Sequence, residues 1–103
     1  MKRITFSVGQ GKTKAGLTIQ NVSHKRTLAY LRVSQVYGGY TAKVCSGGWV
    51  STDGELIEEN SLVIEAVTDI GTDHEVVAGY LRDLFEQSCV LMTVEDLETV
   101  KFV

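Results

Sequence analysis

The sequence predicts one small α+β domain in which helices cover a β-sheet. Residues 2–8 and 40–45 alternate apolar and polar side chains, as half-buried strands do. Residues 76–85 instead repeat apolar side chains at helical spacing. The chain has 103 residues, of which 44% are hydrophobic and 22% charged, as in an ordinary single globular domain. We therefore expect residues 1–103 to form one domain.

The remaining elements of the first half are less regular. Residues 9–16 contain three glycines and two lysines, which predicts a loop. Residues 17–22 fit a short extra strand. Residues 23–36 are predicted as a helix, with Ser23 as its N-cap and Gly38 supplying the left-handed residue that ends it.

The middle of the chain is predicted as a hairpin. Ser46-Gly47-Gly48 should interrupt the strand that starts at residue 40, because glycine weakens a strand or marks a bulge. Asp53-Gly54 favours a tight turn, and residues 56–67 return from it. The second part of this return, residues 61–67, is apolar enough for a central strand.

The last third is predicted as a helix followed by two strands. Thr72 and Glu75 have the spacing of a capping box, directly before the helix over 76–85. Residues 88–94 are predicted as an apolar strand, and residues 98–103 as a last alternating strand.

Together these elements give the order β-α-β-β-α-β plus a C-terminal strand, which is the ferredoxin-like arrangement. We expect a two-layer sandwich: an antiparallel sheet with two helices on one face. Domains of this type often cover the open sheet face with a second copy, so a homodimer is expected.

Charge is distributed very unevenly along the chain. Residues 1–50 hold eight of the ten Lys and Arg residues and no acid, whereas residues 51–103 hold all thirteen Asp and Glu residues. Such asymmetry indicates an anionic partner or self-association; alternatively, the two halves pair with each other across the fold. The pI of about 5.3 disfavours nucleic acid as a partner.

A small anion is the ligand that the basic half predicts. The segment Gly9 to Thr13 is no Walker loop, because Phe6 stands where that motif needs its first glycine. A glycine-rich loop and a basic helix N-terminus can still bind an anion, although a mobile loop and solvated charges are the alternatives. The candidate anion-binding residues are Lys12, Lys14, His24, Lys25, Arg26 and Arg32.

Aromatic residues lie near these basic ones. Tyr37, Tyr40 and Trp49 flank the predicted hairpin and are candidates for an interface or for stacking on a ligand; packing in the core is the alternative.

No catalytic or metal-binding pattern is evident. The two cysteines, Cys45 and Cys89, and the two histidines lack metal-ligand spacing, so we expect no cofactor and no metal. Glu58 and Glu59 offer an acid/base pair, but adjacent strand residues face opposite sides, which favours a charged outer edge. No stretch is apolar enough for a membrane span or a signal peptide, so a cytoplasmic protein is expected, in the host cytoplasm if the gene is viral.

The second half resembles a family of small uncharacterised ferredoxin-like proteins of bacteria and phages, which includes envelope lipoproteins of unknown function. The resemblance covers about residues 40–103, and Asn60 stands where the family usually has proline. It implies the fold and a lineage but no activity. The residues that carry it are Gly48, Trp49, Gly54, Glu59, Ser61, Tyr80, Phe85, residues 87–91, Val100 and Phe102.

These observations predict a non-enzymatic binding protein. A phage-encoded counter-defence protein, which binds a host protein or sequesters a nucleotide-like anion, fits the size, the acidity and the lack of a catalytic pattern. The alternative is a small dimeric ferredoxin-like enzyme, similar to a monooxygenase or an isomerase.

Overall fold

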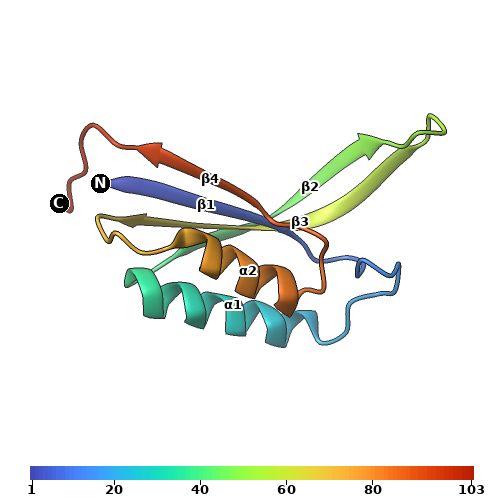
Figure 1. Cartoon of the computed structure of the whole chain (residues 1–103), viewed down its shortest axis with the longest axis horizontal. Helices are drawn as coiled ribbons and strands as arrows, with labels where there is room; N and C mark the ends of the chain where they lie inside the picture. The colour runs from blue at the N-terminus through green and yellow to red at the C-terminus, as the bar shows by residue number, and fades with distance from the viewer.

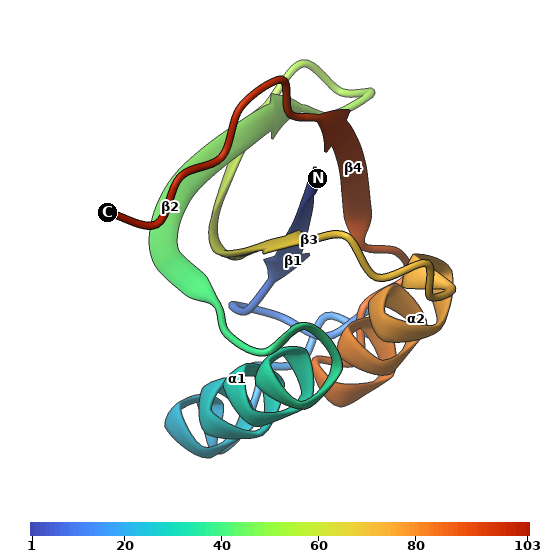
Figure 2. The ribbon, with the colours of Figure 1, turned by 90° about the vertical axis from the view of Figure 1, so that its left-hand side faces the viewer.

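The computed structural model describes all 103 residues as a four-stranded sheet with two helices on one face (Figures 1 and 2). In chain order the elements are β1 (Lys2–Gly9), α1 (Val22–Tyr37), β2 (Thr41–Val50), β3 (Leu56–Thr68), α2 (His74–Leu84) and β4 (Leu91–Asp96). The strand order is β2-β3-β1-β4, and every neighbouring pair is antiparallel. The predicted ferredoxin-like sandwich is thereby confirmed.

The core lies between the helices and the central strands. Ile4, Phe6 and Val8 of β1 and Leu62 and Ile64 of β3 are completely buried, because alternate strand residues share one face. From the helices, α1 adds Ala29 and Val33, and α2 adds Val77 and Leu81, all buried, with Phe85 completing the layer just after α2.

The helix ends differ in part from the prediction. Helix α1 begins at Val22, and its N-cap is Asn21 rather than Ser23, with no side-chain capping bond. Gly38 ends α1 in the predicted left-handed conformation, with φ at 89°, which costs glycine little because it has no Cβ. The N-cap of α2 is Asp73, whose carboxylate accepts a hydrogen bond from the Glu75 backbone N–H, so Thr72 does not form the predicted capping box.

Three strand predictions are wrong. Strand β2 runs unbroken through Ser46-Gly47-Gly48, because Asn60, Glu59 and Glu58 of β3 pair with these residues. Residues 17–22 form no strand beyond a single bridge between Thr18 and Lys12.

The third correction concerns the C-terminus. The last strand is β4 at residues 91–96, and residues 98–103 form none. The last backbone hydrogen bond at this edge of the sheet runs from the Leu97 N–H to the Met1 carbonyl. Beyond it, residues 98–103 have no neighbouring strand with which to pair.

No helix of the structure is long and apolar enough to cross a membrane.

Candidate active site

The β2–β3 hairpin extends beyond the rest of the sheet. Strand β1 ends at Gly9, opposite Ser61 of β3, so residues 46–60 pair with each other, and the Gln10 N–H adds one hydrogen bond to the Asn60 carbonyl. We call residues 46–60 the arm, and Figure 1 shows it rising away from the helices. It accounts for part of the elongated shape, which measures 47 × 28 × 24 Å.

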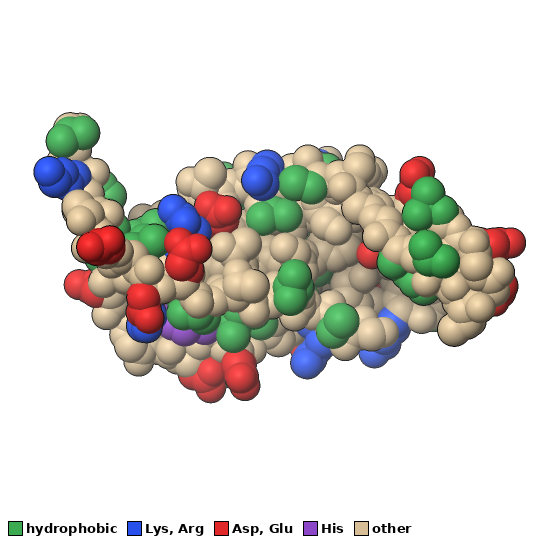
Figure 3. Space-filling view, turned by 90° about the horizontal axis from the view of Figure 1, so that it is seen from above, with side chains coloured by type: hydrophobic (Ala, Val, Ile, Leu, Met, Phe, Trp, Pro, Cys, Tyr) green, Lys and Arg blue, Asp and Glu red, His purple; other side chains and the backbone are tan.

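The arm exposes apolar and acidic side chains. Trp49, Val50 and Leu56 keep more than half of their surface in solvent. Four acids lie on the arm, and no Lys or Arg occurs between Lys43 and Arg82. Figure 3 shows hydrophobic and acidic side chains together at this end of the molecule. Such a surface is suited to a cationic ligand or to a partner, because exposed apolar patches commonly mark binding sites.

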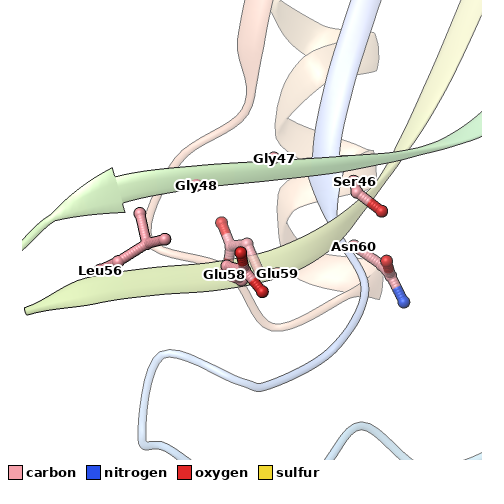
Figure 4. A pocket seen from close by; sticks show the side chains of 7 residues that line it. All are labelled: Ser46, Gly47, Gly48, Leu56, Glu58, Glu59 and Asn60. Carbon is pink, nitrogen blue, oxygen red and sulfur yellow. The ribbon is translucent and has the colours of Figure 1, made fainter.

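An open groove of about 720 Å³ lies on the arm (Figure 4). Apart from Leu56, its walls are polar or glycine. The lining residues are Ser46, Gly47, Gly48, Leu56, Glu58, Glu59 and Asn60.

Two glycines make room for two carboxylates in this groove. In the strand register, Gly47 lies opposite Glu59 and Gly48 opposite Glu58. A Cβ at Gly48 would come within 3.1 Å of the Ile57 carbonyl oxygen, so a larger residue there would push against the facing strand. The absence of side chains on β2 therefore leaves the space above both glutamates empty.

Neither carboxylate has a partner inside the chain. Glu58 and Glu59 form no ion pair and accept no side-chain hydrogen bond in the structure, unlike Asp96, whose pKa is lowered by its hydrogen bond from Lys2 and by the charge of that residue. Two unpaired carboxylates beside an empty groove attract cations and hydrogen-bond donors. The groove is thus a better candidate site than the basic residues that the sequence favoured.

Several of the basic residues predicted to bind an anion have partners within the chain. Lys12 and Lys14 are exposed on the loop, and His24 is exposed on α1. The Lys25 ammonium lies 3.5 Å from a Glu86 carboxylate oxygen, and the Arg26 Nε donates to the Gln10 side-chain oxygen over 2.8 Å.

Arg32 faces another part of the molecule. Its guanidinium carbon lies 4.4 Å above the centre of the Tyr80 ring on α2. Four of the five ion pairs, including both that Arg3 forms, join a base of the first half to an acid of the second. These pairs support the alternative that the two halves pair across the fold.

The three aromatic candidates have three different environments. Tyr37 is a core residue whose hydroxyl lies 2.7 Å from His74 Nδ1, and burial raises its pKa to about 12. Tyr40 is partly exposed and stacks on Tyr30. Of the three, Trp49 alone lies on the arm, so the alternative of core packing holds for Tyr37.

No group of three or more His, Cys, Asp or Glu side chains is placed to hold a metal ion. Both cysteines are free, with Cys45 partly buried and Cys89 exposed.

No family model and no curated protein matches the chain, so the resemblance to uncharacterised bacterial and phage proteins stays a prediction. Two solved structures share its fold. A phage SAM lyase in complex with S-methyl-5′-thioadenosine matches with a TM-score of 0.65 and 17% identity, over 92% of this chain and 80% of the other. A phage SAM lyase in the apo state matches with a TM-score of 0.60 and 19% identity, over 91% of this chain and 78% of the other.

The comparison corrects the functional prediction. A non-enzymatic binding protein is expected from the absence of a catalytic pattern, but both solved structures that share the fold over nine-tenths of the chain are those of an enzyme, a phage SAM lyase. This finding contradicts the prediction of a non-enzymatic protein.

Proposed function

We propose that this protein is an enzyme that cleaves S-adenosylmethionine (SAM) and that the groove on the arm binds the substrate. The observation that carries the proposal is the pair of unpartnered carboxylates, Glu58 and Glu59, in a groove of a chain that has the fold of a SAM lyase. The likeness at 17–19% identity supports the fold; the chemistry of the groove supports the substrate.

SAM and the groove are complementary in charge. The substrate carries a permanent positive charge on its sulfonium and a second one on its ammonium group. At about 4 Å, an attraction between unit charges is worth about 1 kcal/mol in water and about 4 kcal/mol at the dielectric of a protein surface. The two carboxylates, which form no ion pair within the chain, favour such a cation over the anion that the sequence predicted.

The groove also has the size for this ligand. Its volume of about 720 Å³ falls in the range of 300–1,000 Å³ that is typical of small-molecule sites.

The proposed reaction breaks the bond between sulfur and the γ-carbon of SAM. The electron pair of this bond stays on sulfur, and neutral S-methyl-5′-thioadenosine is released. No water is added in a lyase reaction, so the new bond to the γ-carbon forms within the substrate: an oxygen of its own carboxylate attacks this carbon as the sulfur leaves, and the aminobutyrate fragment is released as a lactone. The protein's part is to bind the cation and hold the fragment in a reactive conformation.

Incubation of the purified protein with SAM tests the proposal. We expect S-methyl-5′-thioadenosine to accumulate, measured by chromatography and mass spectrometry, and no oxygen from ¹⁸O-labelled water to enter the released fragment at the moment of cleavage. Intact SAM after prolonged incubation at high enzyme concentration would exclude the proposal, and label in the primary product would make the enzyme a hydrolase.

We further propose that the gene is of phage origin and that the enzyme acts in the host cytoplasm. Cleavage of SAM there would deprive host enzymes that use SAM of their substrate. The proposal therefore keeps the predicted role in counter-defence. The phage source of the two structural neighbours supports this part of the proposal.

We also propose that the chain forms a homodimer through its arm. The exposed side chains of Trp49 and Val50 have no cover within the chain, and Asp53 and Glu55, the acids of the arm that lie outside the groove, complement the exposed Lys12 and Lys14 of the loop. A second copy is the occupant that satisfies both features.

Light scattering across a concentration series checks this association. We expect a mass of twice 11.3 kDa that falls to the monomer value when Trp49 and Val50 are both replaced by serine, because the loss of apolar contact area weakens the interface. Replacement of the equally exposed Leu31 on α1 is the control and should leave the dimer intact. A monomeric wild-type protein at high concentration would refute the dimer.

A further inference from the structure

Gln87 lies at the junction of α2, the loop and the base of the arm. The chain reverses after α2 at Glu86, which has a φ of 53°. The side-chain nitrogen of Gln87 then donates two hydrogen bonds, to the Lys12 carbonyl over 2.7 Å and to the Phe85 carbonyl over 2.9 Å. Both N–H groups of the amide are thus occupied, and this fixes the direction of its oxygen.

The Gln87 oxygen approaches the end of β1 at Gly9. A Cβ at Gly9 would lie only 2.6 Å from this oxygen and 3.8 Å from one carboxylate oxygen of Glu59. Because Gly9 has no side chain, the Gln87 amide oxygen can lie close to its backbone. The Glu59 carboxylate of β3 lies next to the same position.

These two side chains present hydrogen-bond acceptors without a donor. No side chain or backbone N–H of the chain donates to the Gln87 oxygen or to the Glu59 carboxylate in the structure, and an ionised carboxylate has no proton of its own to give. Because rotation of the amide would break both of its hydrogen bonds, the Gln87 oxygen remains an acceptor. Glu59 is exposed and Gln87 partly buried, so water can occupy this place, and a ligand that replaces the water at both acceptors brings two neighbouring donors.

We infer that Gln87 and Glu59 together bind the vicinal hydroxyls of a ribose and make the site specific for ribonucleosides over deoxyribonucleosides. This inference rests on the proposed function, because an adenosyl compound brings such a diol into the groove that Glu59 lines. Of the groups of S-methyl-5′-thioadenosine, the 2′- and 3′-hydroxyls are the adjacent pair of donors. Carboxylates bind ribose hydroxyls in this way in other nucleotide sites.

The experiment measures the binding of three compounds by calorimetry: S-methyl-5′-thioadenosine, its 2′-deoxy analogue and its 3′-deoxy analogue. We expect the wild-type protein to bind at least one deoxy analogue about 10-fold more weakly, as for the loss of one hydrogen bond to a charged group. In Gln87→Ala this penalty should shrink to about 2-fold or less, since one acceptor is gone. Gln35→Ala, an exposed glutamine on α1, is the control and should keep the wild-type penalty.

The ratio of affinities separates recognition from structural damage. Gln87→Ala also frees the Lys12 and Phe85 carbonyls, and a looser loop would weaken all three compounds by the same factor. An equal loss for all three would overturn the inference and leave Gln87 a structural residue. Equal binding of the three compounds by the wild type would also overturn it while leaving the proposed function in place, whereas no binding of any of them would overturn both.

Discussion

Replacement of both Glu58 and Glu59 by glutamine should lower kcat/KM for SAM about 100-fold or more. The substitution keeps the size of each side chain and removes both negative charges from the groove. Each charge-assisted contact to a bound cation or hydroxyl is worth about 1.5–3 kcal/mol, and each 1.4 kcal/mol corresponds to a factor of ten in rate. Steady-state kinetics with S-methyl-5′-thioadenosine as the measured product gives the result directly.

The two single variants should differ in a way that assigns the roles. Glu58→Gln should weaken the binding of cationic SAM but leave that of neutral S-methyl-5′-thioadenosine nearly unchanged, whereas Glu59→Gln should weaken both. Glu55→Gln is the matched control, because Glu55 is an acid of the same arm that does not line the groove. Wild-type kinetics for the double variant, or an equal loss in the control, would remove the groove as the active site.

The fold could be predicted because its local signals agree with the tertiary structure. Alternation in residues 2–8 matches the buried face of β1, and the apolar spacing of residues 76–85 matches the face that α2 buries. Helix α1 was harder to delimit, since its apolar face is narrow and its N-cap, Asn21, makes no side-chain bond. The strand predicted at the C-terminus failed because alternation alone does not provide a neighbouring strand.

The groove on the arm does not follow from the pattern of a single strand. Glu58 and Glu59 are adjacent, and neighbours on a strand face opposite sides, which argues against an acid/base pair. The useful signal was symmetry about Asp53: Gly47 and Gly48 lie as many residues before it as Glu59 and Glu58 lie after it. Two glycines opposite two glutamates indicate a gap above carboxylates, a feature that single-strand reasoning does not reveal.

The anion site stays a prediction, although three of its residues have partners within the chain. Lys25 and Arg26 contact Glu86 and Gln10, and Arg32 lies against Tyr80. Three of the eight bases of the first half, Lys2, Arg3 and Lys25, form ion pairs with acids of the second half. The four acids of the arm form none, and a groove with this negative charge attracts a cationic ligand.

Replacement of Phe6 by alanine should cost about 3–5 kcal/mol of the free energy of unfolding. Phe6 is completely buried on β1, between β3 and β4, and its ring centre lies 6.4 Å from that of Tyr37. Removal of a buried aromatic ring loses its transfer free energy and leaves a cavity that the neighbouring strands cannot fill. Domains of this size are stable by about 5–15 kcal/mol in total, so the variant should retain only part of its stability.

Urea unfolding followed by far-ultraviolet circular dichroism is the suitable measurement. Trp49 fluorescence is a poor probe, because this residue is 55% exposed on the arm and reports little of the core. Thr5→Ala, one position away on the opposite face of β1, is the control and should cost about 1 kcal/mol or less. If the alanine variant does not fold, Phe6→Leu, which loses less side-chain volume, provides an intermediate value. Protein concentration must be held constant across the series, since dimer formation adds to apparent stability. A cost below about 1 kcal/mol for Phe6→Ala would mean that the sheet and helices are held together elsewhere, and would contradict the two-layer core on which the position of the arm depends.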